Sequence, residues 1–232
     1  MMQNSLLICF IGIDGSGKTT QAKLLLDWLE SRGIKSMYVW SRGEVLTIRR
    51  IFLFMGRRAL GTSGREIASD KKAYGEYQSR KSKLMENSLV RIVWSAMTYA
   101  EHLIQINLDI RRKMRDGWVV VCDRYLWDSS VDIATLNSKN PEWLSGWFNR
   151  FMWKFIPKPT ITFFIDVPPE EAMKRKNDIP SVDYVRKRAE HYRYLAKYNS
   201  LTVINGCEDS AAIQNKIIYM VNKYIEGKEN NG

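Results

Sequence analysis

The sequence predicts a three-layer α/β fold, in which helices cover both faces of a central parallel sheet of about five strands. Three observations support this prediction. Five short segments are almost wholly apolar, as expected for strands that are buried on both faces. Segments with the apolar spacing of amphipathic helices lie between them. A glycine-rich segment joins the first apolar run to the first helical pattern, and this order is typical of α/β domains.

The strands are predicted from their apolar runs, which do not alternate with polar residues. The first run, LLICFI, is followed directly by the glycine-rich segment. The third and fourth runs, VVVC and ITFFI, each end in an aspartate. The five predicted strands cover residues 5–11, 37–40, 118–122, 160–167 and 201–204.

The helices are predicted from apolar residues at i, i+3, i+4 and i+7. In the first helix, residues 18–32, these positions are occupied by Ala22, Leu25, Leu26 and Leu29, and Gly33 stands where a C-terminal cap belongs. Further helices are predicted over residues 84–115, 141–155, 181–198 and 211–224.

The helix predicted over residues 141–155 carries several aromatic residues on one face. We expect this face to pack in the core, and an interface between two copies of the chain is the alternative. The residues concerned are Trp143, Trp147, Phe151 and Phe155.

We expect a single domain over residues 1–232. This length suits one compact domain with an ample core, and the sequence shows neither an internal repeat nor a linker between domains. Residues 56–83 contain glycine and many charged residues, so a mobile segment is expected there.

The composition restricts the partners and the compartment. The formal net charge is +11, which favours anionic partners such as nucleotides. The three cysteines are scattered and only two histidines occur, which argues against a zinc site and predicts buried thiols in a reducing cytoplasm. No apolar run reaches the roughly 18 residues of a membrane span, and the N-terminus does not resemble a signal peptide, so no membrane partner is expected.

Residues 12–20, GIDGSGKTT, match the phosphate-binding pattern GxxxxGK[ST]. The glycines allow the backbone N–H groups to converge on phosphate oxygens, and the start of the following helix adds partial positive charge. Lys18 is expected to reach the outer phosphates, and the Thr19 hydroxyl is placed to bind Mg²⁺. The predicted nucleotide-binding residues are Gly12, Gly15, Ser16, Gly17, Lys18, Thr19 and Thr20.

Asp123, which directly follows the predicted strand WVVVC, is a second polar element. Ligand sites in doubly wound sheets form at the carboxyl ends of strands, so Asp123 is expected beside the phosphate-binding loop. It could hold Mg²⁺ through water, together with Thr19, or accept the acceptor's proton. A helix cap or a turn is the alternative role for an acid in this place.

Three motifs together resemble the thymidylate kinase family of nucleoside monophosphate kinases. They are GIDGSGKTT, CDRY and FFIDVPPEEAMKR, and their spacing is also similar to that of the family over about residues 5–205. The resemblance implies a P-loop kinase fold with a short basic lid, the use of ATP and Mg²⁺, nucleotide substrates and a homodimer. The leading function is the conversion of dTMP and ATP to dTDP and ADP.

The resemblance also assigns residues on the acceptor side. Asp14 matches a loop acid that faces the acceptor's sugar, and hydrogen bonding within the turn is the alternative. Arg124 matches the arginine that holds the acceptor phosphate, for which a planar guanidinium is well suited. Arg42 lies where the family places another phosphate-binding arginine, although the usual motif REPGGT is absent here.

Positive charge on the transferring phosphoryl group is expected from Lys18 and from a basic lid over residues 174–188. Some family members carry a basic residue inside the phosphate-binding loop, where this chain has Gly15 and Ser16. The candidate lid arginines are, in order, Arg175, Arg186 and Arg188. The predicted catalytic residues are Lys18, Asp123, Arg124 and Arg175.

Two segments on the acceptor side depart from the family pattern. In VWSAMTYAEH, Met97 and Thr98 replace an acid and the arginine that reads thymine. Trp94 could stack on a base, although its helical spacing also suits the core. After DRY, Asp128 replaces a serine. With Asp132 it could bind a sugar, a base amine or a metal, or it could cap the helix that starts there.

Two alternatives to the leading function remain at this point. One is a kinase of another small acceptor, such as a nucleoside or a different nucleotide. The other, of a different class, is a nucleic-acid-associated or regulatory NTPase. The net charge permits it, but no nucleic-acid-binding module is recognisable, so nucleic acid is not the expected partner.

Overall fold

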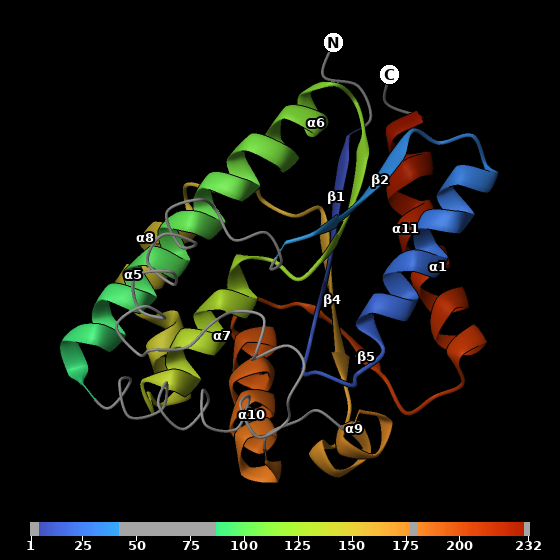
Figure 1. Ribbon diagram of the computed structural model, residues 1–232. Coiled ribbons are helices and arrows are strands. Elements are labelled where there is room, and N and C mark those ends of the chain that lie inside the picture. The colour runs from blue at the N-terminus through green and yellow to red at the C-terminus, as the bar shows by residue number, and fades with distance from the viewer. Residues whose placement is uncertain (1–4, 42–86, 177–180, 230–232) are drawn as a thin grey trace, which may run out of the picture. The chain divides into compact units, whose positions relative to one another are not determined.

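The computed structural model describes residues 5–41, 87–176 and 181–229 (Figure 1). The chain divides into two compact units, Met1–Arg42 with His102–Gly232, and Gly43–Glu101. The sheet and the glycine-rich loop belong to the first unit. The expected mobile segment, 56–83, lies outside the described residues, as does Arg42.

The sheet has five parallel strands in the order β2-β3-β1-β4-β5, which confirms the predicted architecture. From β1 the chain goes first to β2 and β3 on one side and then to β4 and β5 on the other. This reversal occurs beside the carboxyl end of β1, which is where ligand sites form in such sheets. The strands are β1 (Leu6–Ile11), β2 (Ser36–Trp40), β3 (Val119–Asp123), β4 (Ile161–Asp166) and β5 (Thr202–Asn205).

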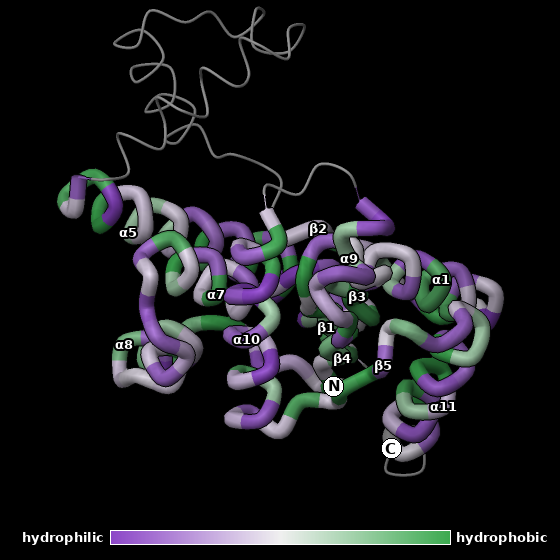
Figure 2. Tube along the Cα trace, turned by 90° about the horizontal axis from the view of Figure 1, so that it is seen from below, coloured by the Kyte–Doolittle hydropathy of each residue, from purple (hydrophilic) through white to green (hydrophobic). Residues whose placement is uncertain are grey.

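Helices cover both faces of the sheet in the first unit (Figures 1 and 2). Helices α1 and α11 lie on one face, and α7 and α10 lie on the other. Helix α5 crosses the boundary between the two units, since its residues up to Glu101 belong to the second. The α-helices are α1 (Lys18–Ser31), α5 (Ser88–Gln105), α6 (Arg111–Arg115), α7 (Leu126–Leu136), α8 (Trp147–Trp153), α9 (Pro169–Arg175), α10 (Val182–Tyr198) and α11 (Ser210–Glu229).

The core is explained by the spacing of apolar residues along the strands and along the helices. Alternate strand residues such as Phe10 point to one face, where they meet Leu25 of α1 and Ile217 of α11 in one buried apolar cluster. On the other face, Phe164 of β4 stacks on Tyr192 of α10 with ring centroids 5.9 Å apart. The strands are therefore buried on both sides, which explains why their sequences are continuously apolar.

Two predicted helices are interrupted. The helix predicted over residues 84–115 is described from Ser88, and a π-helical segment, η1 (Ile106–Ile110), lies between α5 and α6. The helix predicted over residues 141–155 is divided into a 3₁₀ helix, η2 (Pro141–Ser145), and α8, because Gly146 adopts an extended conformation between them.

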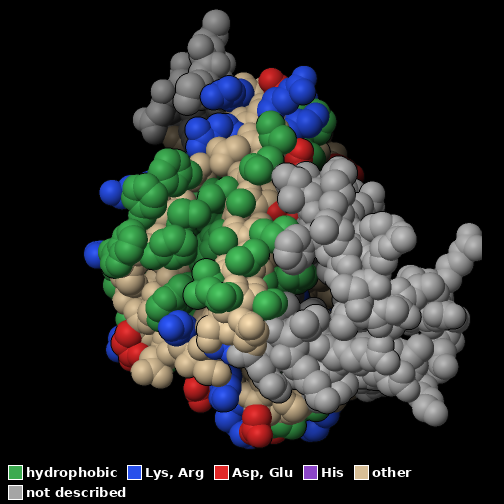
Figure 3. Space-filling model, turned by 60° about the vertical axis from the view of Figure 1, so that its left-hand side comes forward, with side chains coloured by type: hydrophobic (Ala, Val, Ile, Leu, Met, Phe, Trp, Pro, Cys, Tyr) green, Lys and Arg blue, Asp and Glu red, His purple; other side chains and the backbone are tan. Residues whose placement is uncertain are grey.

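The expectation that the aromatic face of residues 141–155 packs in the core is wrong. Trp147 is 73% exposed, Phe151 51% and Phe155 49%. The buried residue of α8 is instead Asn149, whose side-chain amide donates to the carbonyl of Trp143 at 2.8 Å. Asn149 thus lies on the inward face of α8, and the aromatic side chains lie on the surface. Figure 3 shows a face of the molecule on which hydrophobic side chains gather.

The cysteines are free thiols. Cys9 and Cys122 are buried in neighbouring strands, as predicted, but Cys207 is exposed because it lies in the loop between β5 and α11. None of the helices in the described ranges combines the length and the apolar character that a membrane crossing requires.

Gly206 is closely packed against the side chains of Val167 and Ile165, which can be tested by substitution. A Cβ atom there would lie 2.5 Å from Val167 Cγ1 and 2.8 Å from Ile165 Cγ2. We expect Gly206→Ala to lower the free energy of unfolding by about 1–3 kcal/mol, because buried neighbours must shift. The matched control is Gly227→Ala in α11, where a Cβ would meet nothing within 4 Å. Urea denaturation of both variants measures the difference, and equal stability of the two would contradict this account of the packing.

Candidate active site

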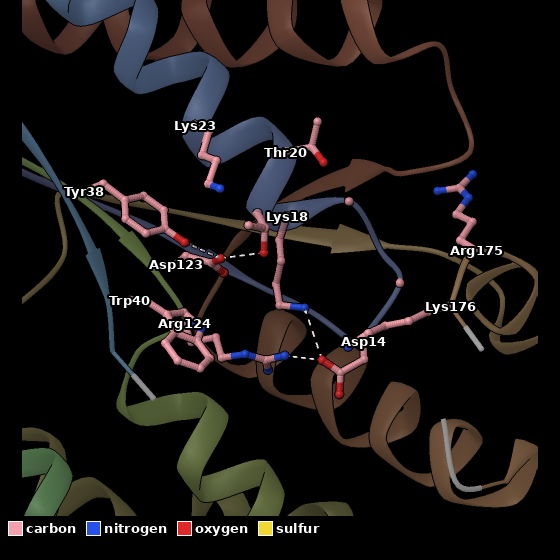
Figure 4. A pocket seen from close by; sticks show the side chains of 13 residues that line it. Asp14, Lys18, Thr20, Lys23, Tyr38, Trp40, Asp123, Arg124, Arg175 and Lys176 are labelled. Carbon is pink, nitrogen blue, oxygen red and sulfur yellow. Dashed lines mark hydrogen bonds and ion pairs between the residues drawn. The ribbon is translucent and has the colours of Figure 1, made fainter. Parts of the chain in front are cut away.

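A pocket of about 950 Å³ lies in the first unit, beside the carboxyl ends of the central strands (Figure 4). The phosphate-binding loop and the first turns of α1 form one side, and residues from the ends of β2, β3 and α9 form the rest. Its lining residues are Asp14, Gly15, Gly17, Lys18, Thr19, Thr20, Lys23, Tyr38, Trp40, Asp123, Arg124, Arg175 and Lys176.

The pairing of β1 with β3 brings the two predicted motifs together. Phe10 lies opposite Asp123, and the backbone N–H of Arg124 donates to the carbonyl of Phe10 at 2.9 Å. The loop that follows β1 and the Asp123–Arg124 pair that follows β3 therefore leave the sheet at the same edge. This confirms that Asp123 lies beside the loop.

The loop is shaped by glycines whose positive φ angles are unfavourable for other residues. Gly15 has a φ of 84°, and a Cβ there would lie 2.4 Å from the carbonyl oxygen of Ala172 in α9. Gly17, at φ 92°, is the N-cap of α1. The helix N-terminus thus faces the pocket, with neither a capping side-chain bond nor an acidic residue in its first turn, which suits an anionic ligand. Of the predicted nucleotide-binding residues, Gly12 and Ser16 do not line the pocket.

Lys18 is a buried cation within the pocket. It is 4% exposed, and its Nζ donates to the carbonyl of Ile13 at 2.9 Å and lies 3.8 Å from Asp14. Burial, and then the positive charge of Arg124, lower the pKa of Lys18 to about 7. Phosphate oxygens would favour the charged form, so the lysine is suited to an anion that is brought into the pocket.

Arg124 is held between two carboxylates. Its Nη2 is hydrogen-bonded to Asp14 (Figure 4), and its Nη1 lies 3.3 Å from Asp128 Oδ1. Its backbone φ of 73° is unusual for a residue other than glycine and is typical of functional sites. Burial by itself would lower the pKa of Arg124, but the negative charges of Asp128 and Asp14 raise it, so the guanidinium stays charged.

Asp128 supports Arg124 from outside the pocket. It is 1% exposed and accepts hydrogen bonds from the backbone N–H of Tyr125 at 2.8 Å and the hydroxyl of Tyr192 at 2.6 Å. Asp128 therefore acts as a helix cap, because its carboxylate accepts the backbone N–H of Tyr125, the N-cap residue of α7. Burial raises the pKa of Asp128.

Asp123 is fully buried and its two oxygens differ in their surroundings. Oδ2 accepts hydrogen bonds from the Thr19 hydroxyl at 2.6 Å and from the Tyr38 hydroxyl at 2.9 Å. Oδ1 has no hydrogen-bond partner among the described residues. A buried carboxylate oxygen without a partner is costly, and a hard cation or its water would satisfy it. These residues therefore fit a magnesium site.

The sequence did not predict Tyr38 as a site residue. Burial, and then the negative charge of Asp123, raise the pKa of Tyr38 above its usual value, so the phenol remains a hydrogen-bond donor. Lys23, Trp40 and Lys176 also line the pocket and were not predicted. Lys23 follows Thr19 by four residues on α1, and this spacing is a signal that could have placed both side chains on one helix face.

The three candidate lid arginines lie in different surroundings. Arg175 lines the pocket, and it donates to Glu171 at 3.0 Å and to the carbonyl of Gly206 at 2.9 Å. Arg186 is on the surface, paired with Asp183 at 2.8 Å.

The structure does not support Arg188 as a lid arginine, although the sequence made it a candidate after Arg175 and Arg186. It is 1% exposed in α10 and is hydrogen-bonded to Asp132, Tyr184 and Tyr192. Asp132, the last acid of DRYLWDSSVD, therefore pairs with a buried arginine. Trp94, the candidate for stacking on a base, is half-buried on α5 in the second unit.

Comparison with known proteins gives a consistent result. Residues 74–217 match the family model described as Thymidylate kinase. A probable thymidylate kinase of Thermococcus kodakarensis is 30% identical over 93% of this chain and 97% of its own length. A probable thymidylate kinase of Pyrococcus abyssi is 27% identical over 93% of this chain and 95% of its own length. A thymidylate kinase of a Thermoanaerobacter species is 28% identical over 94% of this chain and 98% of its own length.

The family model covers the strand that ends in Asp123, the arginine after it and the α9 segment, whereas the phosphate-binding loop precedes the matched residues. The similarity to the relatives extends over nearly the whole chain. Because the matched residues make up more than half of the sequence and a relative at 30% identity covers almost all of it, the chain belongs to the thymidylate kinase family.

Proposed function

We propose that this chain transfers the γ-phosphoryl group of ATP to dTMP and releases dTDP and ADP. The observation that carries the proposal is the convergence of the phosphate-binding loop, Asp123 and Arg124 in one pocket. The acceptor is taken from the relatives, which are named as thymidylate kinases or probable ones.

The donor side of the pocket supports the binding of a triphosphate. Backbone N–H groups at the start of α1 and the Lys18 ammonium bind its phosphates. Thr19 and Asp123 would hold Mg²⁺, which, when bound, neutralises charge on the phosphates. Arg175, at the α9 side of the pocket, adds positive charge near the transferring group.

On the acceptor side, Arg124 holds the phosphate of the monophosphate and Asp14 faces its sugar. The guanidinium is already oriented by two carboxylates, so little side-chain freedom is lost on binding. Catalysis then consists of positioning and electrostatic stabilisation, as is usual for phosphoryl transfer.

We also propose that the protein is a homodimer of the cytoplasm. The free thiols fit a reducing compartment. The exposed aromatic face of α8 suits an apolar interface, and exposed Leu108 of η1 adds to it, since Asn107 donates to the carbonyl of Phe155 at 3.0 Å.

The acceptor is tested by measuring ADP release with ATP and a panel of acceptors. We expect the highest kcat/KM with dTMP, a lower value with other nucleoside monophosphates, and none above background with thymidine. The control is Lys18→Met, which removes the phosphate-binding ammonium. Preference for an unphosphorylated nucleoside, or ADP release that needs no acceptor and accompanies salt-dependent DNA binding, would favour the alternative functions.

The role of Arg124 is tested by Arg124→Lys, which keeps the charge and removes the planar fork. We expect the KM for dTMP to rise roughly 10- to 100-fold while the KM for ATP changes little. Arg115→Lys, at the exposed end of α6, is the matched control. Equal losses for donor and acceptor would contradict the assignment of Arg124 to the acceptor phosphate.

The dimer is tested by Phe151→Glu, which places a charge in the exposed aromatic face. Light scattering after size-exclusion chromatography should give the mass of a dimer for the unmodified chain and of a monomer for the variant. Tyr219→Glu in α11, where the tyrosine is 62% exposed, should leave the mass unchanged. A monomeric unmodified chain would remove this part of the proposal.

A further inference from the structure

The carboxylate of Asp123 is held by two neutral donors on one oxygen. The hydroxyls of Thr19 and Tyr38 both donate to Oδ2, at 2.6 and 2.9 Å. Both lone-pair directions of that oxygen are thus occupied, while Oδ1 has no partner within the described ranges. Figure 4 shows the Tyr38 hydroxyl directed at the Asp123 carboxylate, with a dashed line between them.

The sheet places Tyr38 in this position. In the parallel pairing of β2 with β3, Tyr38 lies opposite Val121 and Trp40 lies opposite Asp123. Side chains two residues apart on a strand share a face, so those of Tyr38, Val121 and Asp123 all lie on the face that α1 covers. The Tyr38 ring packs against the apolar cluster on that face, and its hydroxyl reaches the carboxylate at the end of the next strand.

We propose that Tyr38 is a positioning residue for the metal site, which together with Thr19 fixes the Asp123 carboxylate so that Oδ1 is offered to the cation that accompanies ATP. This inference rests on the proposed function, because it takes the pocket to bind ATP with Mg²⁺. Tyr38 acts through Asp123 and needs no contact with the metal or with the reacting atoms.

The choice of a phenol has a physical reason. A lysine or arginine in this place would also orient the carboxylate, but its charge would cancel the charge that attracts the cation. The neutral hydroxyl of Tyr38 leaves the negative charge of Asp123 in place. A carboxylate can exchange its two oxygens by rotating about its last bond, and removal of one of the two donors to Oδ2 weakens the restraint on that rotation.

The test compares nucleotide binding with and without the metal. The dissociation constant of a non-hydrolysable ATP analogue is measured by calorimetry in Mg²⁺ and again in EDTA, and the ratio of the two values reports the coupling to the metal. Tyr38→Phe keeps the ring and removes only the hydroxyl. We expect it to reduce the coupling ratio roughly tenfold while the metal-free dissociation constant stays within about twofold. Tyr219→Phe, on exposed α11, should change neither.

A double-mutant cycle identifies the route of the effect. If Tyr38 acts through the carboxylate, Tyr38→Phe should have no further effect on the coupling ratio in an Asp123→Asn background. An effect of the same size in that background would overturn the inference. So would an unchanged ratio in Tyr38→Phe when the unmodified chain shows strong coupling, and in that case the proposed function stands. Absence of coupling in the unmodified chain would instead refute the metal site and this inference together.

Discussion

The parallel pairing of β1 with β3 is the constraint on which the site depends. It sets Phe10 opposite Asp123 and gives the backbone N–H of Arg124 a partner in the carbonyl of Phe10, so that the phosphate-binding loop and the Asp123–Arg124 pair leave the sheet together. A shift of one residue in this register would turn Asp123 to the opposite face, away from Thr19. The positive φ of Arg124 is tolerated because the sheet, the Phe10 carbonyl and two carboxylates hold the residue on every side.

The charges of the pocket are arranged so that ligands replace contacts that already exist. Lys18 and Arg124 are almost fully buried, and each lies close to at least one carboxylate. The pKa of Lys18 is lowered because burial has a larger effect on it than the nearby carboxylates, which raise it. Phosphate groups would supply the negative charge that the burial of these cations calls for. The site is thus preorganised for anions, and little reorganisation is needed when they bind.

The sequence predicted the features that depend on neighbours in the chain. The strands and the glycine-rich loop were predicted correctly, because apolar runs and loop glycines are local signals. The position of Asp123 beside the loop depends on the pairing of β1 with β3, but it could be predicted because the carboxyl ends of parallel strands meet at one edge of a sheet. Side-chain contacts that depend on the exact register of distant segments were missed. Tyr38 acquires its role only through the register of β2 with β3. Arg188 was placed in the lid because it lies in a basic stretch, but the helical period turns it inward to Asp132.

The two carboxylates on Arg124 differ in burial, and this difference assigns them different tasks. The side chain of Asp128 is 1% exposed and also accepts hydrogen bonds from Tyr125 and Tyr192, so it is firmly held against the arginine. The side chain of Asp14 is 29% exposed, lines the pocket and comes from the loop. Asp14 also lies 3.8 Å from the Lys18 ammonium, so this more exposed carboxylate is shared between two cations at the pocket. On the proposed function, an acceptor phosphate would compete with Asp14 for Arg124, while the buried Asp128 would keep the guanidinium in place.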